Sequence, residues 1–516
     1  MQIFATEQIR AWDEYTIRHE PIASVDLMER AATACFEWLL QNGFKGKQFS
    51  IFCGKGNNGG DGLAIARLLA ESHHTVTVYI LEFGHKGTDD FQVNLARLHE
   101  TTAQIRFISS EETLHPVPSA DTIIDALLGS GLNRPLEGLT ANLVKHINQS
   151  GNEIIAIDIP SGLFVDHSSK NNEVIHARHT LSFQCYKPAF MVAENAAYIG
   201  EVHILDIGLH AGYLKITPSP YQLIDAPLVR SIIQPRSPFS HKGDYGHAAI
   251  IAGSHGMMGA AVLCARACLR SGVGKLTCHI PAIGYTIMQV SAPEAMSKVE
   301  GFDPPVVGQA FAQDSAQGYI KSVSDLEQYN AVGIGPGIGR YASHTALLQS
   351  VFEQNRHPMV IDADALNVLS EEKTLLSKIP AGSVLTPHPK EFERLFGKSV
   401  NEFERIKTAL QKAAEYQIHI VVKGRYTFIA SPDGAGYFNS TGNAGMATGG
   451  TGDVLTGIIT GLLAQKYAPL HAAIAGVYLH GLAGDLAAAY TSQPSLIASD
   501  IVDFMGQAYQ VISNKY

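Results

Sequence analysis

Apolar positions along the chain fall into two patterns that alternate. Short apolar runs such as 48–53 and 331–334 end in glycine-rich or polar segments and predict buried strands. Segments with apolar residues at three- and four-residue spacing, such as 5–41 and 402–417, predict amphipathic helices. Because strands that alternate with helices form mostly parallel sheets, the pattern predicts an α/β fold.

The alternation is interrupted once, between residues 210 and 245. This segment carries prolines at 218, 220, 227, 235 and 238, which is typical of a linker with short ordered pieces. A chain of 516 residues is also too long for one hydrophobic core. We therefore predict two domains, 1–214 and 225–516.

Composition narrows the class of protein. With 46% apolar and 17% charged residues the chain is globular, and a net charge of −10 argues against nucleic-acid binding. We find no apolar run long and unbroken enough to span a bilayer, and no export signal at the start. The six cysteines are scattered without a C-x-x-C pair, so we expect a reduced, cytoplasmic protein with no membrane partner.

Three predicted strands of the first half end in polar loops. Residues 48–53 lead into GKGNNGGDG, 121–128 into GSGLNRP, and 153–159 into PSG. Ligands collect at the carboxyl ends of parallel strands. Asp125 and Asp158 interrupt apolar runs there, and a buried carboxylate needs a partner. A bound cation, a catalytic role or a structural hydrogen-bond network would each supply one, and Lys187 is a candidate for a substrate phosphate.

The first of these loops also matches a dinucleotide fingerprint. Gly54, Gly56 and Gly59 satisfy G-x-G-x-x-G, and Glu82 follows at the required distance, which favours a dehydrogenase. A pyrophosphate-binding turn does not need Asn57, Asn58 and Asp61, however. Two amides and a carboxylate suit a cation, a sugar or a polar ring better, although ordinary Asn-Gly turn chemistry also explains them.

In the second half, TGNAGMATGGTGDVLTGIITG (441–461) changes from a glycine-dense loop into a predicted helix. Free amides at a helix start attract anions, and a carboxylate at residue 453 could act as a base next to a bound hydroxyl. Asp453 could equally be an ordinary helix cap. His388, between two prolines, is either structural or faces a ligand. No G-x-x-x-x-G-K-[ST] motif occurs, which argues against a P-loop NTPase.

The first half resembles the NAD(P)HX epimerase domain of the bifunctional NAD(P)H-hydrate repair enzymes through GKGNNGGDG, ALLGSGLNRPLEG, AIDIPSGL and SFQCYKP. The resemblance implies a Rossmann-like three-layer α/β/α domain. It implies that a potassium ion (K⁺) is bound by Asn58, Asp125 and Ser161, and we choose Asp158 for proton transfer. The implied substrate contacts are Asn57, Asn58, Gly59, Gly60, Asp61, Gly129, Ser130, Gly131, Leu132, Asn133, Arg134, Pro135 and Asp158.

The second half resembles the ADP-dependent NAD(P)HX dehydratase, a ribokinase-like α/β/α domain, through GIGPGIG, VIDADALN, LTPHPKEFERL, VVKGRYT and NAGMATGGTGDVLTG. The implied catalytic base is Asp453, with Mg²⁺ sharing the phosphate charge. The implied substrate contacts are Ala261, Gly337, His388 and Asp453. The implied nucleotide contacts are Lys423, Gly424, Arg425, Tyr426, Thr427 and Gly452.

Together the resemblances imply one chain with two repair steps. It would interconvert R- and S-NAD(P)HX and dehydrate the S form of NADHX or NADPHX with ADP, giving NAD(P)H, AMP and phosphate. The preference for ADP over ATP rests on resemblance alone, and such families commonly form homo-oligomers. One alternative is a ribokinase-type vitamin or sugar kinase with an amino-terminal nucleotide-binding regulatory domain. In another, the first half is not an enzyme, and it binds a nucleotide or a partner and regulates the second half.

Overall fold

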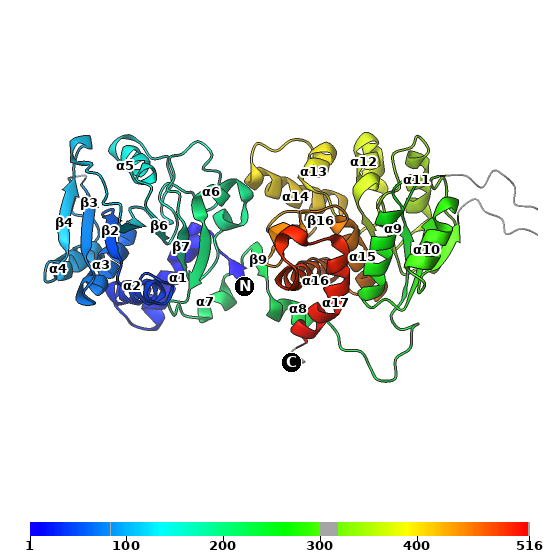
Figure 1. Cartoon of the computed structure of the whole chain (residues 1–516), viewed down its shortest axis with the longest axis horizontal. Coiled ribbons are helices and arrows are strands. Elements are labelled where there is room, and N and C mark those ends of the chain that lie inside the picture. Colours follow the sequence, from blue (N-terminus) through cyan, green and yellow to red (C-terminus); the bar gives the residue numbers. More distant parts are fainter. Residues whose placement is uncertain (83, 300–317, 514–516) are drawn as a thin grey trace, which may run out of the picture. The chain divides into compact units, whose positions relative to one another are not determined.

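The computed structural model describes residues 1–82, 84–299 and 318–513 (Figure 1). The chain divides into two compact units, Met1–Ser219 with Asn401–Phe403, and Pro220–Val400 with Glu404–Tyr516. The division at residue 219 falls inside the proline-rich segment. Each unit has its own sheet and its own hydrophobic core.

The sheet of the first unit is parallel throughout and has the order β4-β3-β2-β5-β6-β7-β8. The chain runs outward from β2 to β4, then returns to β5 on the other side of β2. This reversal leaves a crevice between the loops that follow β2 and β5, where ligands of doubly wound sheets bind. The strands are β2 (Gln48–Cys53), β3 (Val76–Leu81), β4 (Gln104–Ile108), β5 (Asp121–Ala126), β6 (Ile154–Ile157), β7 (His179–Phe183) and β8 (Glu201–Leu205).

Helices cover both faces of this sheet. Ile51 and Val78 point to a core shared with α2 (Ser24–Gln41) and α3 (Asn57–Glu71), whereas Phe52 and Tyr79 point to the opposite core beneath α5 (Gly138–Gln149). The helices α1 (Thr6–His19) and α4 (Asp89–Leu98) complete the layers. The alternation of side chains along each strand thus fills two cores, and the predicted three-layer α/β/α fold is confirmed.

One prediction about this unit is wrong in detail. We expected residues 54–62 to be a loop, but α3 begins at Asn57. A Cβ on Gly59 would overlap the carbonyl oxygen of Gly54, so glycine lets the first helical turn lie directly on the strand end. Tertiary packing therefore overrides the low helix propensity of the Asn-Gly sequence.

The sheet of the second unit has the order β9-β18-β17-β16-β15-β14-β13-β10-β11-β12. Its strands are parallel from β12 to β16, and β17 is antiparallel to both of its neighbours. The order reverses between β10 and β13. The strands are β9 (Tyr221–Ile224), β10 (His247–Ile251), β11 (Lys275–Ile280), β12 (Met296–Val299), β13 (Ala331–Ile334), β14 (Met359–Ile361), β15 (Val384–Leu385), β16 (His419–Val422), β17 (Phe428–Ala430) and β18 (Gly436–Asn439).

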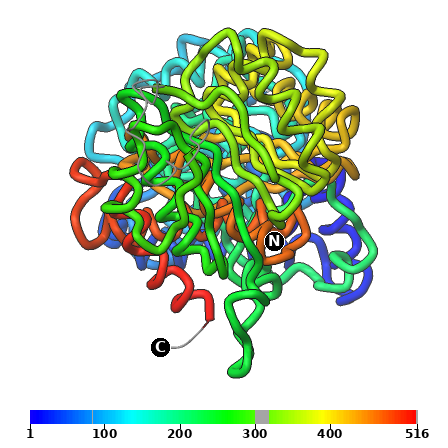
Figure 2. The backbone as a smooth tube through the Cα atoms, turned by 90° about the vertical axis from the view of Figure 1, so that its right-hand side faces the viewer, coloured from blue at the N-terminus to red at the C-terminus, as the bar shows by residue number. Residues whose placement is uncertain are grey.

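Four helices of this unit form one continuous layer: α9 (Met258–Arg270), α15 (Thr451–Ala464), α16 (Pro469–Tyr490) and α17 (Ala498–Ile512). A second group comprises α11 (His344–Gln354), α12 (Ala363–Glu371) and α13 (Pro389–Phe396). Between α8 (Ala226–Ile232) and β10 the backbone runs out from the unit as a loop, and Phe239 on it is 97% exposed (Figure 2).

The helix α16 corrects the expectation about apolar runs. Its 22 residues are long and apolar enough to cross a membrane by length and composition alone. However, 67% of its apolar window is buried against the rest of the unit, including α15 and α17. We therefore interpret α16 as a core helix.

Candidate active sites

A cavity of about 680 Å³ opens at the crevice between β2 and β5 in the first unit. Most of the predicted substrate contacts line it, namely Asn57, Asn58, Asp61, Gly129, Ser130, Gly131, Leu132, Asn133, Arg134 and Asp158. Three others are not among its lining residues: Pro135 is exposed, Gly59 packs on the Gly54 carbonyl, and Gly60 faces the Met28 sulfur.

Asp158 follows β6 in the left-handed conformation (φ 67°) and lies in the wall of the cavity. One carboxylate oxygen is 2.8 Å from the Lys187 ammonium, and the other accepts a hydrogen bond of 2.9 Å from the Ser130 amide. Burial raises the pKa of this carboxyl, but the Lys187 charge and the hydrogen bonds bring the pKa below its usual value. Asp158 is therefore ionised at neutral pH.

This contact overturns one prediction. Lys187 has no exposed surface and also donates to Ser182, so it cannot reach a substrate phosphate. Its role is to hold a negative charge in the cavity wall, which fits the rule that a buried ion needs an opposite partner.

The three predicted potassium ligands lie at and beneath the floor of the cavity. Asp125 has no exposed surface and accepts hydrogen bonds from the Ser161 hydroxyl (2.6 Å) and amide (2.8 Å). Both polar atoms of the Asn58 side chain are buried, and no partner for them exists in the part of the chain that the structure describes. A Cβ on Gly129 would lie 3.2 Å from the Asn58 Cβ and 3.0 Å from the Asp158 Oδ2, so this glycine keeps the loop close to both side chains.

Sequence reasoning missed Asp13, which α1 contributes to the same cavity. Burial and the nearby Asp158 raise the pKa of its carboxyl to about 7. Burial, Asp158 and Asp13 also raise the pKa of Asp61 well above its ordinary value. A signal was present in the sequence, because Ile9, Asp13 and Ile17 fall at four-residue spacing on one face of α1. Asp13 is thus a carboxylate on an otherwise apolar helix face, which is a position that indicates a functional role.

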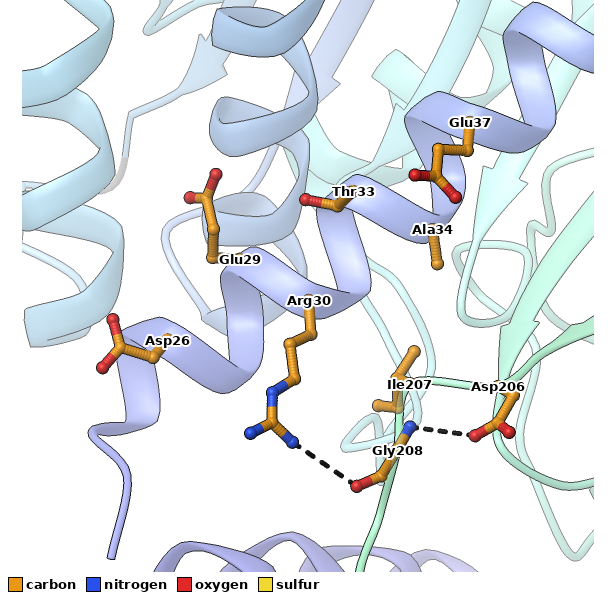
Figure 3. A pocket seen from close by; sticks show the side chains of 9 residues that line it. All are labelled: Asp26, Glu29, Arg30, Thr33, Ala34, Glu37, Asp206, Ile207 and Gly208. Atoms are coloured by element: carbon orange, nitrogen blue, oxygen red, sulfur yellow. Dashed lines mark hydrogen bonds between the residues drawn. The ribbon is translucent and has the colours of Figure 1, made fainter. Parts of the chain in front are cut away.

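A second hollow in this unit, of about 550 Å³, lies beside α2 and the segment that follows β8 (Figure 3). It is rich in carboxylates, and two of its charged groups, Glu29 and Arg30, already have partners. Glu29 forms ion pairs with Arg67 and Arg97, and Arg30 pairs with Glu20. We assign no ligand to it.

In the second unit, Asp453 occupies the first turn of α15. Gly450 precedes the helix in the left-handed conformation (φ 92°), and this N-cap residue has no side chain with which to cap the first amides of the helix. Burial and the nearby carboxylate of Asp362 raise the pKa of Asp453 to about 7. An uncapped helix start with such a carboxyl in its first turn can hold an anion and exchange a proton side by side.

A cation lies next to this turn. The Lys423 ammonium is 2.8 Å from Asp362 and 4.0 Å from Glu391, and a Cβ on Gly452 would lie 3.3 Å from it. The Thr456 hydroxyl donates to the other oxygen of Asp362 at 2.8 Å. Asp362 was missed as a functional residue, although it ends an apolar strand in the same way as Asp125.

The remaining predicted contacts differ in accessibility. His388 caps α13, since its Nδ1 accepts from the Lys390 amide at 3.1 Å, yet its side chain is 44% exposed. Arg425 is exposed and donates to the Gly442 carbonyl at 2.7 Å. Ala261 is 0% exposed, and its contact with the substrate stays a prediction. Gly337 is also buried, with its carbonyl bound by Ser254 at 2.8 Å.

Family comparisons match both units. Residues 248–505 match the model described as NAD(P)H-hydrate dehydratase, and residues 24–189 match that of the YjeF-related protein N-terminus. A bifunctional NAD(P)H-hydrate repair enzyme of Moorella thermoacetica is 34% identical, and the match covers 94% of this chain and 92% of that one. The chain belongs to the bifunctional NAD(P)H-hydrate repair enzyme family. The Escherichia coli K12 member is 35% identical, with 92% of this chain and 88% of that one covered.

The family assignment confirms the resemblance drawn from the motifs and rejects the dehydrogenase hypothesis. Glu82, which a dinucleotide site would need for a ribose, instead binds Lys55 and the Gly84 amide. Among solved structures, an ADP/ATP-dependent NAD(P)H-hydrate dehydratase of Bacillus subtilis, co-crystallised with ATP and Mg²⁺, is 33% identical with a TM-score of 0.47. It covers 56% of this chain, and 98% of that chain is matched.

Proposed function

We propose that the first unit of this repair enzyme epimerises R- and S-NAD(P)HX and that the second unit dehydrates S-NAD(P)HX with ADP, giving NAD(P)H, AMP and phosphate. The proposal about the second unit rests on one observation above all. A carboxyl with a pKa of about 7 lies at an uncapped helix start, beside the Lys423 ammonium.

Each group in the second unit then has a role. Asp453 takes the proton of the ring hydroxyl while the hydroxyl oxygen attacks the terminal phosphorus of ADP. The bond between that phosphorus and the oxygen of AMP breaks in the same step. The amides at the start of α15 and the Lys423 ammonium stabilise the charge on the transferred phosphoryl group. The C–O bond then breaks with phosphate as leaving group, and loss of a ring proton restores the double bond of the dihydronicotinamide. Magnesium would share the phosphate charge.

The first unit carries two carboxyls suited to the two halves of an epimerisation. One route of inversion breaks the C–O bond of the hydrated carbon and forms it again on the other face. Asp13, with a pKa of about 7, can give a proton to the leaving hydroxyl, and ionised Asp158 can take one from the returning water. Two neighbouring carboxyls whose environments separate their pKa values are a common arrangement for acid and base.

The residues proposed for K⁺ fit a cation. The Asn58 amide oxygen is buried without a hydrogen bond from the described residues, and Asp125 adds a buried negative charge. A monovalent ion there would fix the loops around the cavity. Asn58→Ala should raise the K⁺ concentration needed for half-maximal R-to-S conversion by at least about tenfold, because even indirect partners of a metal site contribute 10–100-fold.

Added K⁺ should also raise the thermal midpoint of the unmodified protein more than that of Asn58→Ala. Tetramethylammonium is the reference ion in this measurement. Asn171→Ala is the matched control, since Asn171 is exposed and is not among the residues that line the cavity. Identical K⁺ dependence of Asn58→Ala and the unmodified protein would reject the potassium assignment.

The dehydratase should lose activity in mild acid. Because the base must be ionised, a pKa raised to about 7 means that the rate falls as the pH drops through 7. With ADP saturating, the rate at pH 6 should be about one tenth of the rate at pH 8. A flat profile between these values, with ADP binding unchanged, would exclude Asp453 as the titrating group.

A direct assay tests the proposal as a whole. Pure protein is incubated with hydrated NADH and either ADP or ATP, and the absorbance of reduced nicotinamide is followed together with free phosphate. Equal yields of NADH and phosphate support a dehydratase. A stable phosphorylated product without NADH would instead support the kinase alternative.

A further inference from the structure

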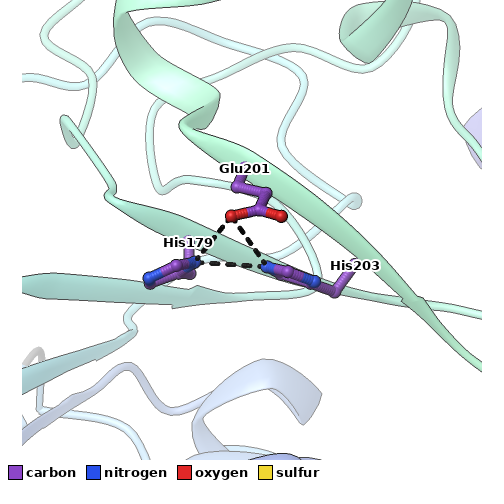
Figure 4. A group of neighbouring side chains, drawn as sticks. All are labelled: His179, Glu201 and His203. Atoms are coloured by element: carbon purple, nitrogen blue, oxygen red, sulfur yellow. Dashed lines mark hydrogen bonds and ion pairs between the residues drawn. The ribbon is translucent and has the colours of Figure 1, made fainter. Parts of the chain in front are cut away.

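Two histidines and a glutamate gather on one face of the sheet in the first unit, at the amino ends of β7 and β8 (Figure 4). His179 pairs with Glu201 across the two strands, and His203 is two residues further along β8. Because side chains alternate along a strand, residues two apart share a face. The register therefore brings all three side chains together, whereas the active-site cavity lies at the carboxyl ends of the strands.

The three facing atoms have the spacing of a metal-ligand set. The His179 Nδ1 is 3.2 Å from the His203 Nε2, and the Glu201 Oε2 lies 3.9 Å and 4.0 Å from these nitrogens. Zinc binds imidazole nitrogen and carboxylate oxygen at about 2.0–2.2 Å in a tetrahedron, which places ligand atoms roughly 3.3 Å apart. The nitrogens already meet this distance, and the exposed carboxylate of Glu201 has to move by less than about 1 Å.

The surroundings hold the rings in this orientation. The Trp38 ring lies 4.6 Å from the His203 ring and 5.3 Å from the His179 ring, measured between centroids. The far nitrogen of His179, Nε2, is 3.8 Å from a carboxylate oxygen of Glu153. Metal-binding histidines commonly turn their second nitrogen towards a carboxylate, which fixes the tautomer and increases the basicity of the ligand nitrogen.

Neutral histidines would also explain part of this geometry, since one ring can donate a hydrogen bond to the other. That explanation does not account for the carboxylate near both facing nitrogens or for the second carboxylate on the far side. With side chains 17% and 21% exposed, the two rings leave room for water in a fourth position.

We propose that His179, Glu201 and His203 bind a divalent transition-metal ion, with Zn²⁺ preferred, and that the ion joins the edge strand β8 to β7. Nitrogen-rich sites select such ions over Mg²⁺ or Ca²⁺. The segment after β8 carries Ile207 and Leu209, which line the active-site cavity. The ion would thus be structural, and it would stabilise one wall of that cavity from the opposite end of the strand.

The test uses the full-length protein after removal of metal with a chelator. Calorimetric titration with Zn²⁺ should show one equivalent bound, and Co²⁺ should give the intense visible bands of a tetrahedral nitrogen and oxygen site. The double variant His179→Gln/His203→Gln should lose at least tenfold in Zn²⁺ affinity together with those bands. Zn²⁺ should raise the thermal midpoint of the unmodified protein but not that of the variant.

Two further single variants test whether the effect on Zn²⁺ binding is specific to the proposed site. Glu201→Gln changes an exposed side chain and should weaken Zn²⁺ binding without affecting folding. His99→Gln, at an exposed position at the end of α4, should bind like the unmodified protein. The proposal is overturned if all variants bind Zn²⁺ with the affinity of the unmodified protein. It is also overturned if the unmodified protein does not bind Zn²⁺. R-to-S conversion is measured separately, so loss of the metal site and failure of the epimerase proposal are distinguishable.

Discussion

Asp453→Asn should reduce NADH formation from hydrated NADH and ADP by about 10²–10⁴-fold, which is the contribution of a positioned general base. Asparagine keeps the size and one oxygen of the side chain but cannot accept the hydroxyl proton. ADP binding, measured by calorimetry, should stay within a few-fold of the unmodified protein because Lys423 and the amides of α15 are untouched. R-to-S conversion without nucleotide should be unchanged, since the epimerase site belongs to the other unit.

The stability of this variant provides the control for folding. Asp453 is largely buried near Asp362 and Asp364, and its pKa is raised in the folded protein. A group with a raised pKa loses its stabilising contribution as the pH increases through the folded pKa, so at pH 8 the ionised carboxylate destabilises the fold. Asp453→Asn should therefore have an equal or higher thermal midpoint at pH 8. Asp503→Asn, an exposed surface change, should affect neither property. Full dehydratase activity in Asp453→Asn would remove the assigned base.

The second large effect is expected in the first unit. Asp13→Asn and Asp158→Asn should each slow R-to-S conversion by about 10²–10⁴-fold, because each removes one partner in proton transfer. The two variants should differ in stability. Asp158→Asn leaves the buried Lys187 ammonium without its counter-charge, which costs several kcal/mol, of the order of 3–5, and lowers the thermal midpoint. Asp13→Asn removes a carboxyl that burial already disfavours, so its midpoint should not fall.

Because Asp158→Asn combines two effects, Asp13→Asn is the sharper test. Conversion is followed by resolving the two epimers over time in full-length protein without nucleotide, and the spontaneous rate is subtracted. Asp26→Asn, exposed on α2, serves as the matched control. Undiminished conversion in both Asp13→Asn and Asp158→Asn would mean that the cavity between β2 and β5 is not the epimerase site.

The fold was predictable because both halves repeat a simple pattern. Strands such as β2, β11, β13 and β14 begin and end where the apolar runs do, since parallel strands are buried on both faces. The start of α3 was not predictable from local preference, because packing of Gly59 on Gly54 decides it. The apolar length of α16 was underestimated, and its burial depends on neighbouring helices that periodicity does not reveal.

The candidate sites were predictable where a loop follows a strand. Asn58 and Asp453 stand in short glycine-rich segments, and Asp125 interrupts an apolar run just before one. Asp13 was missed because it comes from the middle of a helix, and only the fold brings α1 to the cavity. Lys187 was predicted as a candidate for a substrate phosphate. Its burial against Asp158 depends on long-range contacts that local sequence does not report.

The helix that carries Asp453 rests on α9 through small residues. A methyl group on Gly457 would overlap the Cys264 carbonyl, and one on Gly461 would overlap the Ser271 hydroxyl. Two helices this close move as one body, so a bulkier residue about one or two turns down the axis displaces the carboxylate at its tip. Loss-of-function alleles in this gene should consequently cluster at the contact between α9 and α15, away from the substrate and nucleotide contacts. Substitutions there would disturb the packing of the two helices and so move the Asp453 carboxylate out of position.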